Sequence, residues 1–225
     1  MMIALPNADG SFTCTLFWPF SGPNSFEALR TDRDIRSCFD RLFPDAVPLM
    51  PTLVEDYLES PTGSLVTVRC RPWHHRDRVA LVGDACHAVV PFYGQGANAA
   101  FEDCLVLDDC LRSREFDWSA ALEEYDRRRK DDVDVLADLA IANFLEMRDH
   151  VASRVFLMKK SAEKALHRIF PGSFVPLYSM VTFSRVPYAE AVSRARRQWA
   201  TVQRVGAAIA GLFLILLLLL LWRLA

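Results

Sequence analysis

Residues 83–98 bring together a carboxylate, two closely spaced glycines and the expected start of a helix. Gly83 and Asp84 follow the apolar run 79–82, and a carboxylate at the carboxyl end of a buried strand lies where open α/β folds bind their ligands. Asp84 would accept hydrogen bonds from hydroxyl groups of such a ligand. Gly94 and Gly96 would allow the backbone to approach a planar ring closely.

The helix expected over residues 97–111 adds a second element of binding chemistry. The first turn of a helix carries N–H groups without intrahelical acceptors and the positive end of the helix dipole. Both would stabilise an anionic ring edge, and a reduced flavin has such an edge at its pyrimidine ring. Gly-Asp alone is a weak signal because it is common in structural turns, whereas the whole run 83–103 is specific.

Short apolar and alternating segments predict the strands that position these residues. Residues 1–5 and 12–17 flank the turn sequence 7–10, which predicts a β-hairpin with one buried face. Residues 64–71 alternate in the same way and predict a further strand. Residues 79–82 are continuously apolar, as in a strand that is buried on both faces.

Much of the remaining chain has helical periodicity. A short helix is expected over residues 32–42, and a further amphipathic helix over 152–169. A long helix is expected after Ser119, and the charge run 123–134 is interpreted as its solvated face. Its apolar stripe has a gap at Arg129 and otherwise follows helical spacing through Leu122, Tyr125, Val133, Leu136, Ala140 and Met147.

The uncharged apolar segment 205–222 predicts a membrane span that acts as a tail anchor. It would form roughly 27 Å of helix, which is close to the thickness of the hydrocarbon core of a bilayer. The excess of positive charge before this segment places the preceding residues in the cytosol. A buried core helix is the alternative, but residues 214–221 are apolar on every side. The flanking arginines are Arg194, Arg196, Arg197, Arg204 and Arg223.

Composition argues against several other classes of protein. The formal net charge of -2 and the pI near 6.2 give no support for nucleic-acid binding. The six cysteines form no CxxC pair, and no secretory signal is recognised, so the thiols are expected to be free. The five histidines lack metal-ligand spacing, and no metal site is predicted. His87 is expected to support the loop near Asp84 rather than to take part in chemistry.

The run 83–103 resembles the second FAD motif of the aromatic-ring hydroxylases, the single-component flavin monooxygenases. The resemblance continues with one branch of that family, which acts on L-kynurenine. It implies an α/β (α+β) fold: part of a substrate-domain β-sheet, the strand, loop and helix of the second FAD motif, a C-terminal helical layer and one transmembrane helix. The corresponding parts would be residues 1–75, 76–115, 116–203 and 204–223. The matching segments are residues 1–7, 11–17, 43–46, 143–148 and 174–185.

This resemblance implies FAD as the cofactor and NADPH as a cosubstrate. Asp84, together with Gly83, would hold the ribityl and pyrophosphate side of FAD. The backbone N–H groups of Ala97 and Asn98, which follow Gly96, would bind the pyrimidine edge of the flavin. The implied reaction is the hydroxylation of L-kynurenine to 3-hydroxykynurenine with NADPH and O₂. No side chain is expected to be catalytic, because the cofactor carries the chemistry.

The resemblance also implies a substrate pocket. Asn143 and Tyr178 match positions that hold the amino-acid end of the substrate, and Glu146 and Met147 lie beside them. Apolar wall and rim positions match Ile3, Leu5, Phe17, Pro91 and Phe92.

Plainer interpretations of the same residues stay open. Asn143 lies on the apolar stripe of its helix, where a buried amide is often a packing contact. Tyr178, Phe17 and Phe92 read as core residues. Glu146 reads as an ion-pair partner of Arg148 or Lys159.

The sequence departs from the family in one respect. No GxGxxG fingerprint follows an early strand, and this is the motif that holds the ADP part of FAD in the family. The chain is therefore expected to correspond to the C-terminal half of the enzyme and to be inactive alone. The alternative is a tail-anchored, non-catalytic membrane protein derived from a flavin monooxygenase. The resemblance implies the mitochondrial outer membrane, with the residues before the span facing the cytosol.

Overall fold

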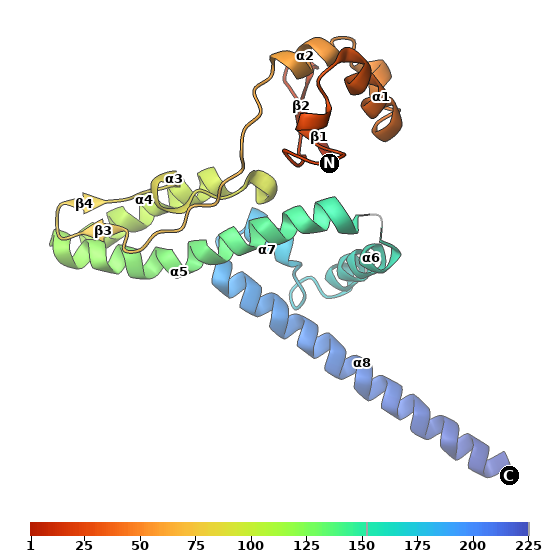
Figure 1. The fold of residues 1–225 in the computed structure, drawn as a ribbon. Helices are drawn as coiled ribbons and strands as arrows, with labels where there is room; N and C mark the ends of the chain where they lie inside the picture. The colour runs from red at the N-terminus through yellow and green to blue at the C-terminus, as the bar shows by residue number, and fades with distance from the viewer. Residues whose placement is uncertain (152, 225) are drawn as a thin grey trace. The chain divides into compact units, whose positions relative to one another are not determined.

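The chain forms two compact units, Met1–Leu65 and Val66–Ala225. The computed structural model describes residues 1–151 and 153–224, without the side chains of residues 217, 218 and 224. Figure 1 labels the elements of both units. The described part combines helices with two small antiparallel sheets, in agreement with the predicted α/β (α+β) class.

The first unit begins with the predicted β-hairpin. β1 (Met2–Pro6) pairs antiparallel with β2 (Phe12–Leu16), and the N–H of Gly10 donates to the carbonyl of Asn7 at 3.1 Å to close the turn. The predicted buried face of this hairpin is not found within the unit: Phe12 is 61% exposed and Leu5 is 58% exposed. Only the ends of the hairpin, at Met2 and Leu16, pack against the small helical core.

Two helices and two 3₁₀ turns complete the first unit. α1 (Asp32–Leu42) has the predicted bounds and begins with a capping box, in which Thr31 and Asp34 bond each other's backbone N–H groups. Ile35 and Phe39 of α1 pack against α2 (Leu53–Glu59), and this contact forms the core of the unit. The 3₁₀ turns are η1 (Phe26–Ala28) and η2 (Val47–Leu49).

The second unit starts with less sheet than the sequence predicts. Residues 64–71 form no strand. No described strand runs beside them, and their one backbone hydrogen bond to a neighbouring segment joins the N–H of Val68 to the carbonyl of Ala88 at 2.8 Å. β4 is limited to Val79–Ala80 and pairs with β3 (His74–His75). The prediction of a strand buried on both faces is wrong, since Val79 is 50% exposed.

The central layer of the second unit is a pair of long helices. Short α3 (Asp84–His87) and η3 (Pro91–Tyr93) lead into α4 (Gly96–Ser113), which packs along α5 (Trp118–Leu145) (Figure 1). Trp73, Cys86 and Tyr125 are fully buried between these elements. The stripe predicted for α5 is confirmed, since its members from Leu122 to Ala140 are buried.

The charge run of α5 is a solvated face only in part. Its exposed members include Glu123, Arg127, Arg128 and Asp131, and its buried members are Asp126, Arg129, Lys130 and Asp132. The reason is that α5 packs against α4 and also against α8 (Tyr188–Leu224), so much of its circumference is covered. Arg129, Lys130 and Asp132 of this run form ion pairs there.

The C-terminal helices follow a π-helical turn. η4 (Glu146–His150) extends α5 and leads to α6 (Arg154–Ile169); residue 152, the predicted start of that helix, lies outside the described residues. α7 (Leu177–Phe183) packs against the first turns of α8, where Met180, Ala191 and Leu136 share a core.

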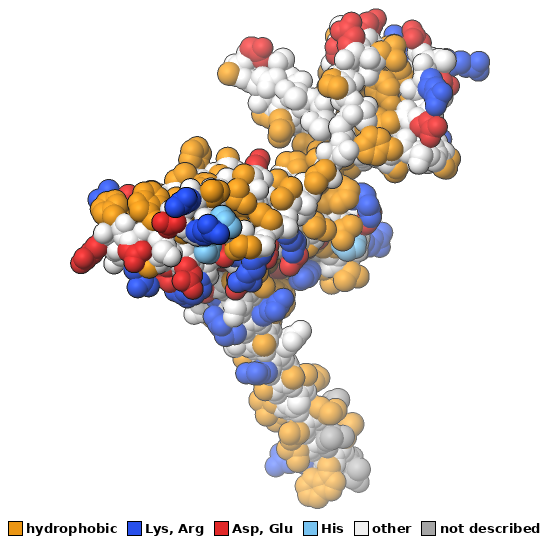
Figure 2. Space-filling model, turned by 60° about the vertical axis from the view of Figure 1, so that its left-hand side comes forward, with side chains coloured by type: hydrophobic (Ala, Val, Ile, Leu, Met, Phe, Trp, Pro, Cys, Tyr) orange, Lys and Arg blue, Asp and Glu red, His pale blue; other side chains and the backbone are white. Residues whose placement is uncertain are grey.

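α8 continues without interruption into the apolar segment 205–222. It is long and apolar enough to cross a membrane, with a mean hydropathy of 2.8 over the best window, none of which is buried. Figure 2 shows the apolar side chains of this segment beyond a stretch of α8 that carries basic ones.

Candidate functional site

Gly83 adopts a backbone conformation that a residue with a side chain would not tolerate. Its φ of +64° and ψ of -140° belong to glycine. A Cβ atom at this position would lie 3.1 Å from the Cβ of Ala100 on α4. The turn therefore brings the start of α3 close to α4, and the exposed side chain of Asp84 follows directly.

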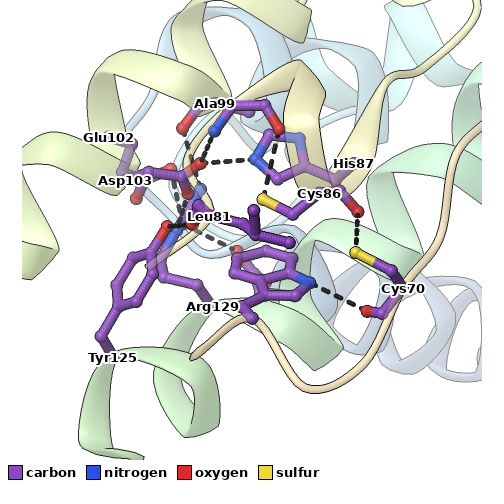
Figure 3. Close-up of polar contacts among 12 residues, drawn as sticks. Cys70, Leu81, Cys86, His87, Ala99, Glu102, Asp103, Tyr125 and Arg129 are labelled. Carbon is purple, nitrogen blue, oxygen red and sulfur yellow. Dashed lines mark hydrogen bonds and ion pairs between the residues drawn. The ribbon is translucent and has the colours of Figure 1, made fainter. Parts of the chain in front are cut away.

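A buried carboxylate, Asp103, ties this turn to both long helices (Figure 3). Its Oδ2 accepts the backbone N–H of Gly83 at 3.0 Å and lies 2.5 Å from Nε2 of His87. Its Oδ1 accepts from Nε of Arg129 at 2.8 Å, and Arg129 also donates to the carbonyl of Ala99 at 3.2 Å. The predicted supporting role of His87 agrees with this contact.

The charges of this network are set by burial and pairing together. Burial alone would raise the pKa of Asp103, but the hydrogen bonds from His87 and Arg129 outweigh it and hold the pKa below its usual value. Burial, followed by the nearby Asp103 charge, raises the pKa of Cys86 to about 12. The carboxylate is therefore ionised and the thiol protonated at neutral pH.

Cys86, His87 and Asp103 have ligand atoms within 4.8 Å of one another, a geometry that a metal ion could use. Each group has another partner, however. The thiol of Cys86 donates to the carbonyl of Gly83 at 3.2 Å, and Asp103 is bound by Arg129. A metal ion would have to displace a buried guanidinium, so we assign the cluster a structural role.

Further buried contacts hold the chain just before Gly83. Leu81 donates its N–H to the carbonyl of Trp73 at 2.7 Å and accepts the hydroxyl of Tyr125 at 3.1 Å. The rings of Trp73 and His87 lie 5.1 Å apart. Burial raises the pKa of Tyr125, so its hydroxyl remains a donor at neutral pH. The turn at Gly83 is thus held from α4 and α5.

The start of α4 offers the helix-end chemistry that the sequence predicts. Ala97 and Asn98 are exposed in its first turn, where backbone N–H groups lack intrahelical acceptors. Gly94 has a φ of +66°, whereas Gly96 does not need a positive φ and would meet Val89 only at ordinary contact distance. Gly94 therefore makes the turn.

These residues fit the polar ends of a flavin cofactor. Asp84 is an exposed acceptor, and the first turn of α4 supplies exposed donors on the same segment. Asn98 also donates to the side chain of Gln95 at 3.0 Å, which fixes the conformation of the turn. The cofactor contacts of Gly83, Asp84, Gly96, Ala97 and Asn98 remain a prediction.

A cavity of about 500 Å³ lies in the second unit among α5, α6, α7 and α8, and Asn143, Glu146 and Tyr178 line it. Glu146 belongs to the π-helical η4, a turn type that is frequent at functional sites. The ring of Tyr178 lies 5.6 Å from that of Tyr93, which also lines the cavity.

Asn143 connects this cavity to the segment before α4. Its Nδ2 donates to the carbonyl of Phe92 at 2.7 Å and lies 3.7 Å from Sδ of Met147. The ring of Phe92 is 4.5 Å from that of Phe144. The helix-packing interpretation of Asn143 is thus supported, and its predicted contact with substrate stays a prediction.

Glu146 has a different ion-pair partner from those considered in the sequence. Its carboxylate lies 3.5 Å from Nζ of Lys160, while Arg148 pairs with Asp149 at 2.7 Å. Burial, followed by the charge of Glu146, raises the pKa of Tyr93 to about 12. The cavity therefore holds both signs of charge beside aromatic rings.

Of the remaining predicted pocket residues, Ile3, Leu5 and Phe17 belong to the first unit, and Pro91 is exposed on η3 of the second unit. Their roles as wall and rim remain predictions.

Asp103 and Arg129 were given no role from the sequence, yet they organise the Gly83 turn. The signal was present: Arg129 occupies a register position within the apolar stripe of its helix, and such a buried cation requires a carboxylate partner. Asp103, at the end of the specific run 83–103, was available to be that partner.

Comparison with known proteins bears on this arrangement. Residues 52–140 match the family described as FAD binding domain. Kynurenine 3-monooxygenases from Salinispora arenicola and Salinispora tropica are 52% and 51% identical over 92% and 93% of this chain, which covers 45% and 46% of their lengths. The kynurenine 3-monooxygenase of Sus scrofa is 46% identical over 86% of the chain and 41% of its own length.

The chain thus spans less than half the length of these relatives. Among solved structures, tetracycline destructase Tet(51) aligns with 70% of this chain and 41% of its own, at 21% identity and a TM-score of 0.40. Identity near one half across almost the whole chain is shared with the kynurenine 3-monooxygenases. The chain is therefore similar to kynurenine 3-monooxygenases over most of its own length, and its residues 52–140 match the FAD binding domain.

Proposed function

We propose that the protein is part of an NADPH-dependent flavoprotein monooxygenase that hydroxylates L-kynurenine to 3-hydroxykynurenine with O₂. The observation that carries this proposal is the identity of 52% and 51% with two kynurenine 3-monooxygenases over 92% and 93% of the chain. In the structure, the hydrogen bond from Asn143 to the carbonyl of Phe92, 2.7 Å long, joins the wall of the cavity to the segment that leads into the first turn of α4. A substrate held in the cavity would therefore be positioned by the same residues that position the cofactor segment.

FAD, when bound, would supply the activation of O₂ and the transfer of one oxygen atom to the aromatic ring. Asp84 would accept hydrogen bonds from its ribityl hydroxyls, and the N–H groups of Ala97 and Asn98 would bind its pyrimidine edge. Phe92 and Tyr93 would help exclude water from the reacting ring, which protects the oxygen transfer from side reactions.

The cavity suits the amino-acid end of the substrate, which carries an ammonium and a carboxylate. Glu146 would attract the ammonium, and Lys160, 3.5 Å from it, would attract the carboxylate. Asn143 and Tyr178 would add uncharged hydrogen bonds. Binding would then replace the pairing of Glu146 with Lys160 by pairs with the substrate.

The membrane location belongs to the same proposal. α8 would anchor the protein through its apolar segment, and the basic residues before that segment would keep the preceding units in the cytosol. We propose the mitochondrial outer membrane as the site.

Purification in detergent of the 225-residue chain and of a longer product carrying a GxGxxG unit would test the proposal. The longer protein should contain stoichiometric FAD and form 3-hydroxykynurenine with NADPH. The 225-residue chain should retain no flavin, because its sequence contains no GxGxxG fingerprint. Stoichiometric flavin on the short chain would contradict its expected inactivity. A flavin-loaded long form that leaves kynurenine unchanged would contradict the assigned substrate.

A further inference from the structure

α6 carries an apolar stripe that no part of the described chain covers. None of its residues is buried, and three large members of the stripe, Val155, Met158 and Ile169, are 77%, 72% and 65% exposed. Ala162 and Ala165 lie between them at helical spacing, so the five side chains share one face. An exposed face of this kind indicates a binding partner.

The surroundings of this stripe are basic. In the described part of the chain, Arg154, Lys164 and Arg168 of α6 have no carboxylate partner. A helix with an apolar face and cationic flanks is typical of segments that lie in the surface of a membrane.

α6 also lies at the level where α8 would enter a bilayer. Nζ of Lys159 lies 5.8 Å from the ring of Trp199, and Trp199 precedes Val205 by roughly 9 Å of helix. The headgroup layer extends about 5–7 Å beyond the hydrocarbon core. The contact between α6 and α8 thus lies at the edge of that layer, where tryptophan side chains are common.

α8 adds further unpaired cations at this level. Within the described residues, Arg194, Arg196, Arg197 and Arg204 form no ion pair, and the last three are exposed. Figure 2 shows basic side chains on α8 just before its apolar segment. Cations at this level strengthen the binding of a protein to an anionic bilayer.

We propose that α6 lies on the surface of an anionic bilayer as a second membrane contact beside α8, with its apolar stripe at the acyl boundary and its basic residues at lipid phosphates. This rests on the membrane anchoring proposed for α8 and is independent of hydroxylase activity. The combination of an apolar stripe, unpaired cations and closeness to the span favours lipid over a second copy of the chain or another segment of a longer protein.

The test uses the full chain in nanodiscs that contain phosphatidylcholine with a photoactivatable diazirine in its acyl chain, with or without phosphatidylglycerol. Mass spectrometry of the digested protein would locate the lipid adducts. We expect adducts in α8 in both lipids and adducts at Val155 and Met158 of α6. Omission of phosphatidylglycerol should lower the α6 adducts by about fivefold or more, because roughly 1 kcal/mol per cation is lost.

Two variants separate the stripe from the rest of the helix. Val155→Glu combined with Met158→Glu should reduce the α6 adducts several-fold and leave those of α8 unchanged. Leu157→Glu is the matched control, because Leu157 is 51% exposed on another face of the same helix, and it should retain the adducts. Circular dichroism would establish that all variants keep the same helix content.

Each contrary result identifies what fails. Adducts in α8 with none in α6 would overturn the surface contact and leave the anchor standing, and cross-links between copies at α6 would then indicate a second chain. The absence of adducts in α8 would overturn the anchor itself. Adducts on α6 that persist in the double variant would show that the stripe is not the contact.

Discussion

Nε of Arg129 donates to Oδ1 of Asp103 at 2.8 Å, and the two residues are 2% and 0% exposed. The pair joins the middle of α5 to α4, and the other oxygen of Asp103 binds the backbone of Gly83. One buried ion pair therefore fixes the turn from which Asp84 projects.

Replacement of Arg129 by methionine should destabilise the protein strongly. The variant leaves the Asp103 carboxylate buried without its cation, at a cost of about 3–5 kcal/mol. Unfolding by denaturant in detergent, followed by circular dichroism, would measure the loss. Arg127→Met is the control on the same helix: its side chain is 70% exposed, and it should change stability by about 1 kcal/mol or less. Equal effects of the two variants would contradict the role given to Arg129.

The stability of the protein should fall at acidic pH through Asp103. Because its pKa in the folded state lies below the ordinary value of 3.8, its contribution is fully present above roughly pH 5 and is lost as the pH falls through the folded-state pKa. Unfolding free energies of the wild type and of Asp103→Asn should differ by a constant amount above pH 5, and the difference should shrink below about pH 4. A difference that is independent of pH down to pH 3 would contradict this.

Gly83→Ala should destabilise the turn. The new Cβ atom would lie 3.1 Å from Ala100, and alanine would be held at a φ of +64°, which costs of order 1–3 kcal/mol. Thermal unfolding would measure the change, and in a flavin-loaded longer form the variant should also lose cofactor. Gly172→Ala is the matched control, since its site has open space and no positive φ. A neutral Gly83→Ala would mean that the backbone relaxes.

Tyr178→Phe should weaken the binding of L-kynurenine in the flavin-loaded enzyme. No described group hydrogen bonds to the Tyr178 hydroxyl, and the residue is 48% exposed at the cavity, so the variant would remove the proposed substrate contact without leaving an unpaired partner. The expected loss is about 1–3 kcal/mol, measured as a change in Kd by flavin fluorescence. Tyr57→Phe, in the first unit, should leave Kd unchanged. Equal affinities of all three proteins would remove Tyr178 from the site.

Asn143→Ala should lower both the stability of the protein and its affinity for substrate, whereas Tyr178→Phe should lower only the affinity. It removes the bond to the Phe92 carbonyl, so stability should fall by about 1 kcal/mol along with substrate affinity. Melting temperature and Kd, measured on the same preparation, would separate the two. A loss of stability with unchanged affinity would support the plain packing interpretation of Asn143.

Leu214→Arg should weaken membrane insertion. An arginine near the centre of a span costs about 2.5–3.5 kcal/mol on insertion scales, so a larger share of the protein should be extracted from membranes by alkaline carbonate. Thr201→Arg, on the same helix before the apolar segment, should leave extraction unchanged. If Leu214→Arg remains in the membrane as the wild type does, residues 205–222 are not its anchor.

Local sequence signals predicted α1, α4, α5 and α6, whereas α2, α7 and the part of α8 before residue 205 were not predicted. The helix over 32–42 has its own capping box at Thr31 and Asp34, and α5 has its stripe, so each pattern contains its own boundaries or its buried face. The hairpin was found for the same reason, because the turn at Asn7 and Gly10 is local.

The strand predictions were wrong where strand pairing depends on residues that are distant in the sequence. The alternation in 64–71 fits a strand, but the backbone becomes one only when another edge runs beside it, and Val68 finds a single partner in Ala88. The buried charges of α5 were missed in a similar way. A run of charged residues on a helix looks the same in the sequence whether it faces solvent or is buried in ion pairs. Only the packing of the neighbouring helices distinguishes the two cases.

α8 runs as one helix from the core contacts of Tyr188 and Ala191 through the segment that would cross a membrane. A continuous helix has no swivel between its ends, and 37 residues amount to roughly 56 Å. The tilt of the inserted segment in the membrane would therefore fix the orientation of the second unit relative to the membrane surface. The cavity beside Trp199 would be held at a constant height above the lipid, and solutes would reach it from a restricted range of directions.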